Sequence, residues 1–352
     1  MGKETFKLSW GNFSPLVRAF RLQLPENSLL ITYIKMVLAG GKAKTIVASL
    51  LFVTCCAYFL YFRVSFQSDF DHFLQNYSIS YRSSEEKRIR SFVFNQNRQL
   101  IKEYNEQHPE ITLKMNKFGD LSIDEFERLF MAPIDDTETP QYEVIPSSLA
   151  GTKAVDWTEK GFIEGRTQRA YTSSTPIAVV QSLEYYAGQR LSVQQLVDCY
   201  AWHSTFAEYY DYVAAFGGLM SEEDYPTIGY PADCAADPSK LAFSLKGRTD
   251  LPYGNQEALQ QAVATSPVVV GFDSKSVLMQ FYSEGIVESD CEHYINTAGL
   301  LVGFGEEDGV EYWRVLTSFG SDWGEAGFVR IRRGGSAPGV CGVATSMVYP
   351  KL

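Results

Sequence analysis

A run of 18 residues without a charged side chain, residues 45–62, constrains this chain more than any other feature of its sequence. As a helix rising ~1.5 Å per residue, the run would be about 27 Å long, enough to cross the hydrocarbon core of a bilayer. A signal peptide normally lies nearer the start of a chain and has a shorter apolar part. We therefore expect one transmembrane helix at 45–62; a buried core helix and a signal-peptide segment are the alternatives.

The charge distribution predicts which way this helix would be oriented. Residues 1–44 contain seven Lys or Arg against two Glu, a net charge of +5, so the remainder carries −16 of the total of −11. Because cytoplasmic flanks are enriched in Lys and Arg, residues 1–44 are predicted to be a cytoplasmic tail. The bulk of the chain would then lie in a secretory or lysosome-like lumen or at the cell exterior, as in a single-pass type II membrane protein. A pI near 5.0 also argues against a nucleic-acid partner.

The cysteines fit this topology. Cys55 and Cys56 lie within the uncharged run, and the other four all follow it. An even number of cysteines on the non-cytoplasmic side is compatible with disulfides in an oxidising compartment. The triplet Asn76-Tyr77-Ser78, on the same side, is a possible acceptor for N-linked glycosylation.

A helical segment with a distinctive spacing follows the uncharged run. Six residues separated by 4, 4, 3, 4 and 4 positions share one helix face. An ordinary amphipathic helix would explain the spacing but not the residue identities, which resemble the signature of the inhibitory propeptide of papain-like cysteine proteases. The six residues are Glu86, Arg90, Phe94, Asn97, Ile101 and Asn105.

A second motif and a linker complete this predicted prodomain. The segment MNKFGDL supplies Asn116, Phe118 and Asp120 of a second propeptide motif, although Lys114 stands where that motif usually begins with glycine. By resemblance, residues 65–131 form an α-helical inhibitor prodomain that blocks the substrate cleft. Residues 132–146 are acidic and flanked by proline, and they are predicted to be an exposed linker.

The remainder, residues 147–352, resembles the peptidase domain of the papain family, of the cathepsin L type. The resemblance extends from AVDWTEKG through the segments SLEYYAGQRLSVQQLVDC and YWRVLTSFGSDWGEAGFVRIRRG to MVYPKL. Residues 182–199 have a helical period and would carry the central helix, whereas the last blocks alternate like antiparallel strands. The implied fold class is α+β, a two-lobed papain-like fold with a helical lobe and a β-barrel-like lobe. The whole layout resembles the type II membrane-anchored papain-like proteases of apicomplexan parasites.

The nucleophile position holds a hydroxyl instead of a thiol. The family places its cysteine six residues after an oxyanion-hole glutamine and ten before the glutamate of the central helix. Gln168 and Glu184 fit those two positions, which puts Ser174 where the cysteine would be. An ungapped reading from Trp157 selects Thr175 instead. Neither choice supplies a thiol, because residues 158–190 contain no cysteine.

The other two catalytic positions are also substituted. Six residues after Cys291, where the family has histidine, the chain has Thr297, and Thr317 replaces the orienting asparagine. Phe319 replaces the tryptophan that shields that pair in the family. A serine nucleophile would need a base within hydrogen-bonding reach, and the domain's imidazoles are only those of His203 and His293.

By resemblance, two of the family's three disulfides are kept, Cys199 with Cys234 and Cys291 with Cys341. The third is missing at both ends, since Tyr171 and the segment AWHSTF occupy its positions.

These residues predict a membrane-anchored, catalytically inactive papain-like homologue that binds peptides or other papain-like proteases. Two alternatives remain, an active peptidase with an atypical serine nucleophile and a protease inhibitor that acts through its prodomain. No pattern in the sequence indicates a cofactor or a metal site.

Overall fold

The computed structural model describes residues 69–134, 153–168, 172–200 and 205–352. The predicted membrane helix at 45–62, the tail before it and most of the predicted linker lie outside these residues. Within them, no helix has both the length and the apolar character needed to span a membrane. The chain divides into two compact units, Met1–Ser80 and Tyr81–Leu352.

The described part of the first unit is one short helix and the turn after it. Residues 69–76 are helical, and residues 77 and 78 form a turn. The helix ends with the Tyr77 N–H bonded to the carbonyl of Phe73 at 3.1 Å and the Ile79 N–H bonded to that of Leu74 at 2.9 Å. Ser78 has a positive φ of 53°, which turns the chain away from the helix axis.

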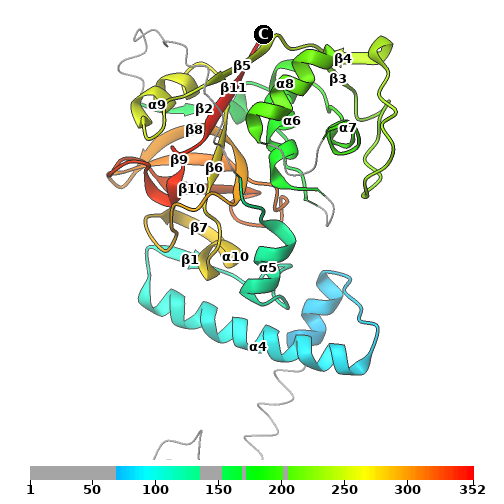
Figure 1. Ribbon diagram of the computed structural model, residues 1–352. Coiled ribbons are helices and arrows are strands. Elements are labelled where there is room, and N and C mark those ends of the chain that lie inside the picture. The colour runs from blue at the N-terminus through cyan, green and yellow to red at the C-terminus, as the bar shows by residue number, and fades with distance from the viewer. Residues whose placement is uncertain (1–68, 135–152, 169–171, 201–204) are drawn as a thin grey trace, which may run out of the picture. The chain divides into compact units, whose positions relative to one another are not determined.

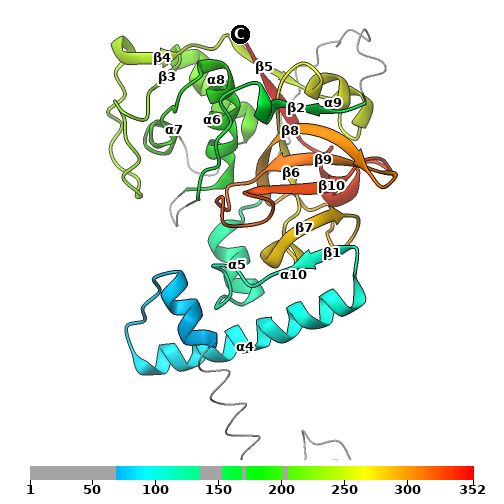
Figure 2. The ribbon, with the colours of Figure 1, turned by 180° about the vertical axis from the view of Figure 1, so that it is seen from behind.

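The second unit begins with the prodomain-like segment, residues 81–134, which contains helices α4 (Ser84–Gln107) and α5 (Ile123–Phe130) and strand β1 (Ile111–Leu113). Ser83 caps α4 by accepting the Glu86 N–H, and Ser122 forms a capping box with Glu125 at the start of α5. The face of α4 expected from the spacing is the buried one, with Phe94, Asn97 and Ile101 inside. In Figures 1 and 2, β1 and α5 lie between α4 and the strands that come later in the chain.

The protease-like domain, residues 153–352, is built around a large sheet. Within the described ranges nine strands belong to it, in the order β1-β7-β10-β9-β8-β6-β11-β5, with β2 paired to β8. Neighbouring strands are antiparallel except β7 and β10, which are parallel. The strands that this domain contributes to the sheet are β2 (Val155–Asp156), β5 (Gly247–Asp250), β6 (Val268–Phe272), β7 (Tyr282–Val287), β8 (Thr297–Glu307), β9 (Val310–Leu316), β10 (Phe328–Arg332) and β11 (Met347–Lys351).

Strand β1 joins this sheet from the prodomain-like segment. It pairs antiparallel with β7, with Ile111 opposite Gly285. Gly285 has a φ of +110°, and a Cβ there would lie 2.8 Å from the Glu110 carbonyl oxygen and 2.9 Å from the Ile111 Cα. Glycine at this position therefore allows the two backbones to approach.

The helices of the protease-like domain lie on two sides of the strands, α6, α7 and α8 on one and α9 on the other, in both views (Figures 1 and 2). The segment 182–199 is not one helix, because Gly188 ends α6 in the left-handed conformation and Ser192 caps α7. The remaining elements are α6 (Ser174–Ala187), α7 (Val193–Cys199), α8 (Phe206–Phe216), α9 (Gln256–Val263), α10 (Val277–Phe281), the short pair β3 (Leu219–Met220) and β4 (Leu241–Phe243), and the single 3₁₀ turns η4 (Trp157–Glu159), η5 (Pro238–Lys240) and η6 (Val340–Gly342).

Two hydrophobic clusters form the core. One packs α6, α7 and α8 against the sheet, and it includes Leu183, Tyr210 and Leu300. The other is shared between the prodomain-like segment and the sheet, because Phe118 and Phe126 pack in the same cluster as Trp313 and Trp323. Burying aromatic side chains on both sides of this boundary makes the prodomain-like segment part of the folded core.

The protease-like domain contains two disulfides, Cys199–Cys234 and Cys291–Cys341, as the family resemblance implied. They close loops spanning 35 and 50 positions. In the chain-entropy model each contributes about 4 kcal/mol to stability.

Candidate functional site

Ser174 is the first residue of α6, and its hydroxyl is buried at that helix end. Its relative exposure is 3%, and its Oγ accepts the backbone N–H of Ala298 at 2.9 Å. The N-terminal end of a helix favours negative charge, so a thiol there would ionise more readily. A serine hydroxyl is far less acidic than a thiol and needs a base to ionise. This contact places Ser174, the residue that the spacing from Gln168 selects, beside Thr297 at the start of β8.

Thr297 belongs to a buried network of hydroxyl, amide and carboxylate groups. Its hydroxyl is bonded to that of Ser274 and donates to Asn296 Oδ1 at 3.1 Å. The Ser274 N–H also donates to Asn296 Oδ1, at 3.0 Å, and Asn296 Nδ2 donates to Asp273 Oδ1 at 2.5 Å. All four side chains are at most 3% exposed. Thr297, the residue predicted to stand at the family's histidine position, thus lies in a hydrogen-bonded polar network.

Three members of this network, Asp273, Ser274 and Asn296, were not singled out from the sequence. Asp273 and Ser274 directly follow the fully buried strand β6, and Asn296 directly precedes β8. Polar residues at the ends of two adjacent buried strands are a usable signal for a polar site. The sequence gives no indication that they bond to one another.

Thr317 bonds within its own loop. Its hydroxyl donates to the Gly327 carbonyl at 3.0 Å and accepts the Phe319 N–H at 3.3 Å. In the described part of the chain, no hydrogen bond joins the side chains of Ser174, Thr297 and Thr317. The three substituted positions therefore do not form a hydrogen-bonded triad.

Among the described residues, no histidine supplies a base to these hydroxyls. His293 is exposed, and no hydrogen bond links it to Ser174, Thr297 or Thr317. His203 lies outside the described residues. Across the described ranges, no three or more His, Cys, Asp or Glu side chains form a group that could hold a metal ion.

Gln168 is bonded both to its own domain and to the prodomain-like segment. Its Nε2 donates to the carbonyl of Phe130 at 3.2 Å, and its Oε1 accepts the Ser318 hydroxyl at 2.9 Å. Gln168 is 6% exposed. The amide expected to stabilise an oxyanion is thus occupied by a peptide carbonyl.

The chain beyond Phe130 continues along the other side of the site. The Ala132 N–H donates to the Asn296 carbonyl at 3.0 Å, and the Ile134 N–H donates to the Ile295 carbonyl at 3.1 Å. Residues 130–134 therefore cross between Gln168 and residues 295–296, beside Thr297. Residues 132–134, assigned to the linker from sequence, are bonded to the protease-like domain, and residues 135–146 lie outside the described residues.

A buried clasp anchors the prodomain-like segment next to this crossing. Asn116 Nδ2 donates to the Gln280 carbonyl at 2.8 Å, and Gln280 Nε2 donates to the carbonyls of Phe118 and Leu121 at 3.1 and 2.9 Å. Phe319 packs against Phe118 and Phe130 edge to face and against Phe126 at a tilt, with ring centroids 5.4–6.3 Å apart. The side chain that replaces the shielding tryptophan thus packs against the prodomain-like segment.

The six residues of the prodomain signature hold the segment together. Arg90 bonds the Asp120 carbonyl at 2.9 Å and Glu125 at 2.7 Å, and Asn97 donates to the carbonyls of Gly119 and Leu121. Asn105 bonds both backbone groups of Leu113 on β1. Glu86 accepts the Arg82 N–H, while Phe94 and Ile101 are buried.

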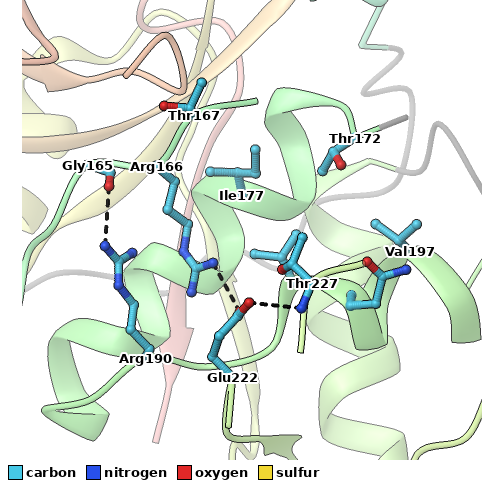
Figure 3. Close-up of a pocket in the computed structure, with 11 residues that line it drawn as sticks. Gly165, Arg166, Thr167, Thr172, Ile177, Arg190, Val197, Glu222 and Thr227 are labelled. Carbon is cyan, nitrogen blue, oxygen red and sulfur yellow. Dashed lines mark hydrogen bonds and ion pairs between the residues drawn. The ribbon is translucent and has the colours of Figure 1, made fainter. Parts of the chain in front are cut away.

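A pocket of about 320 Å³ lies beside the first turns of α6 (Figure 3). Arg166 pairs there with Glu222 at 3.2 Å and with buried Glu184, and Arg190 pairs with Glu164 at 2.7 Å. Burial raises the pKa of Glu184 above its ordinary value, against the opposing effect of Arg166. Because these charged groups pair with one another, we interpret them as a structural network. The network connects the segment that precedes Gln168 to α6.

Comparison with known proteins explains this architecture. The family profile described as papain family cysteine protease matches residues 152–351, and that of the cathepsin propeptide inhibitor domain matches residues 70–126. Digestive cysteine proteinase 2 of Homarus americanus is 31% identical over 303 residues, covering 80% of this chain and 93% of that protein.

Solved structures of proforms have the same fold. Digestive procathepsin L 3 from the larval midgut of Tenebrio molitor superposes with a TM-score of 0.72 at 30% identity, covering 82% of this chain and 99% of that one. A cysteine protease of ragweed pollen in its proform superposes with a TM-score of 0.74 at 29% identity, covering 82% and 94%. The chain belongs to the papain family of cysteine proteases, and it carries a cathepsin propeptide inhibitor domain.

Proposed function

We propose that this chain is a catalytically inactive member of its family, which binds extended peptide segments without cleaving them. The observation that carries the proposal is the state of the Ser174 hydroxyl. It accepts a backbone N–H from Ala298, and no imidazole or carboxylate of the described residues is bonded to it. Removing members of a catalytic triad costs several orders of magnitude in rate. Here thiol, imidazole and carboxamide are all replaced.

The binding role is supported by the contacts that residues 130–134 make. Gln168, Asn296 and Ile295 hold that segment through its backbone carbonyl and N–H groups. Backbone hydrogen bonds recognise an extended chain and depend little on its side chains. We propose that the partners are peptides or the propeptides of active papain-like proteases. The prodomain would stay attached unless another protease cuts the linker at 132–146.

We further propose that the chain is a type II membrane protein of the apicomplexan kind. The support is the uncharged run at 45–62 and the +5 charge of residues 1–44. The domain order would be a tail at 1–44, a membrane helix at 45–62, a prodomain at 65–131, a linker at 132–146 and a peptidase-like domain at 147–352, the last with the family's helical lobe and β-barrel-like lobe. Nearly the whole described chain would then face a lumen or the cell exterior.

The test is a peptidase assay of the chain with its linker cut by an inserted, specific protease site. Turnover of peptide substrates is followed between about pH 4 and about pH 8 with a thiol reductant, the range in which an imidazole base titrates. We expect no turnover beyond that of a Ser174→Ala variant. Turnover that Ser174→Ala abolishes would instead support an active enzyme with a serine nucleophile.

A second candidate, inhibition of other proteases by the prodomain, is favoured by its intact signature. Arg90, Asn97 and Asn105 all make their buried contacts, and Asn116 meets Gln280 across the boundary. Such a prodomain could dock on an active relative. The cut chain would then inhibit a papain-like enzyme in trans, and an Asn116→Ala variant would inhibit it more weakly. If inhibition is absent, the binding role of the cleft stays and this second candidate is discarded.

A further inference from the structure

Two triplets of the form Asn-x-Ser occur in the sequence, and they lie on opposite sides of the uncharged run. One is Asn12-Phe13-Ser14 in the basic tail, and the other is Asn76-Tyr77-Ser78 in the first compact unit. Neither has proline in the middle position, so both meet the acceptor pattern for N-linked glycans. We propose that Asn76 is N-glycosylated and that Asn12 is not.

The local structure leaves the acceptor accessible. Asn76 is the last residue of the helix at 69–76, and both Asn76 and Ser78 are exposed. The turn that follows is closed by the backbone bonds of Tyr77 and Ile79, not by the Asn76 or Ser78 side chains. A glycan on Asn76 Nδ2 would therefore extend into solvent without displacing a bond of this turn.

The modification is a group transfer from a polyprenyl diphosphate oligosaccharide. Asn76 Nδ2 attacks the anomeric carbon of the first sugar, and the bond from that carbon to the diphosphate oxygen breaks. The diphosphate leaves with the electron pair, an N-glycosidic bond forms, and the amide nitrogen loses one proton to solvent. The Ser78 hydroxyl is the group that the transferase reads two positions after the acceptor.

Only residues on the luminal side of the membrane meet this donor and its transferase, so the inference rests on the proposed type II orientation. That orientation places Asn76 in the lumen, 14 residues beyond the end of the uncharged run at Phe62, and leaves Asn12 in the cytoplasm. The two triplets therefore act as reporters on the two sides of one membrane.

The full chain is expressed in a eukaryotic secretory cell, and its mobility is compared before and after an N-glycosidase. We expect a single shift, with Asn76 recovered as aspartate by mass spectrometry after deglycosylation. Asn76→Gln and Ser78→Ala should each abolish the shift, because one removes the nucleophile and the other the hydroxyl. An unmodified Asn76 in the full chain overturns the proposal.

Two added acceptors separate a wrong site from a wrong orientation. Glu257→Thr makes exposed Asn255 an acceptor in the protease-like domain, and its Oδ1 can still cap α9. Leu29→Thr makes Asn27 an acceptor in the tail. If Glu257→Thr gains a glycan while Asn76 has none, the Asn76 proposal fails and the orientation stands. If only Leu29→Thr gains one, both fail.

Discussion

Two regions differ in how their polar groups are paired. One is the surface that binds the prodomain-like segment, and the other is the predicted catalytic site. At the first, Asn116 donates to the Gln280 carbonyl, the Gln280 side chain donates to the carbonyls of Phe118 and Leu121, and β1 extends the sheet beside β7. At the second, the hydroxyls of Ser174, Thr297 and Thr317 are also satisfied, but by separate groups in separate networks. The chain therefore contacts the prodomain-like segment fully, while separate hydrogen bonds occupy the three hydroxyls that the family resemblance assigns to catalytic positions.

This difference separates what binding requires of the chain from what catalysis requires. A binding surface needs complementary shape and paired polar groups, which a papain-like frame provides without chemistry. Catalysis needs a nucleophile and a base in contact, with the base held by a third group. The polar groups of Asn116 and Gln280 are paired as the first requirement asks, and we propose that the reactive positions do not meet the second.

The largest expected effect comes from rebuilding the reactive positions. Ser174→Cys, Thr297→His and Thr317→Asn together restore the family's three groups, with Ser274→Ala added because the Ser274 side chain fills the space beside Thr297. We expect peptidase activity in the linker-cut chain to rise at least ~10³-fold over the parent, the scale on which triads act.

The matched control carries the same changes except Thr297→His. It should stay at background, since the thiol then lacks its base. The fully substituted chain must fold with its disulfides intact for this test. If it then shows no activity, the fold does not position these three residues for catalysis, and our account of the site is wrong.

The next effect concerns the close approach of β1 to β7. Gly285→Ala places a Cβ against the backbone of residues 110 and 111 at a φ of +110°. Overpacking and backbone strain each cost about 1–3 kcal/mol, so binding of the prodomain-like segment should weaken by about 2 kcal/mol or more. Dissociation of that segment from the linker-cut chain measures the loss.

Gly309→Ala provides the comparison. Gly309 has a φ of +83°, but nothing lies within 4 Å of its Cβ position. The Gly309→Ala variant should lower the free energy of unfolding without weakening the binding of the prodomain-like segment. Equal dissociation from both variants would show that strain alone, and not contact with β1, explains the effect.

A smaller effect is expected at the polar clasp. Asn116→Ala leaves buried groups of Gln280 and Phe118 without a partner and should weaken segment binding by about 1–3 kcal/mol. A double-mutant cycle with Gln280→Ala should show coupling, because both side chains bond to the backbone of Phe118. Asn95→Ala, which bonds only within α4, should leave binding unchanged. Additive losses at Asn116 and Gln280 would argue against the clasp.

The smallest effect is a pH dependence inside the prodomain-like segment. Burial works to raise the pKa of the Glu125 carboxyl, but the Arg90 guanidinium and the Ser122 groups outweigh it and hold the pKa below its ordinary value. A depressed carboxyl pKa contributes stability above the unfolded value of ~4.3, and this stability is lost as the pH falls through the folded pKa. Unfolding in urea at about pH 7 and about pH 3 should show that loss, and Arg90→Gln should reduce it. If Arg90→Gln leaves the pH dependence of stability unchanged, that dependence arises from other carboxylates and not from Glu125.

Much of the fold could be predicted from the sequence because particular residues carry strong local or family signals. The spacing from Glu86 to Asn105 predicted α4, and the structure buries the face it defined. The pairing of the four later cysteines followed from the family resemblance and is present. The break after Ala187 was missed, since Gly188 lies within an otherwise helical pattern and only its left-handed conformation ends the helix.

The candidate site was less accessible to such reasoning. Motif spacing could select Ser174, Thr297 and Thr317, because each replaces a residue at a fixed distance from a landmark. It could not identify Ser274 or Asn296 as their neighbours, since those contacts join residues that are far apart in the chain or belong to different strands. Nor could it show that Ala132 and Ile134 bond to residues 296 and 295, because a backbone hydrogen bond leaves no trace in side-chain identity.

The most direct test of the central claim is whether the chain can cut its own linker. The purified full-length protein is incubated at about pH 4 to about pH 6 with a thiol reductant, and its intact mass is followed over time. Our account predicts that the mass stays unchanged over time, as does the mass of the Ser174→Ala variant. Cleavage within residues 132–146 that is absent from Ser174→Ala would contradict it.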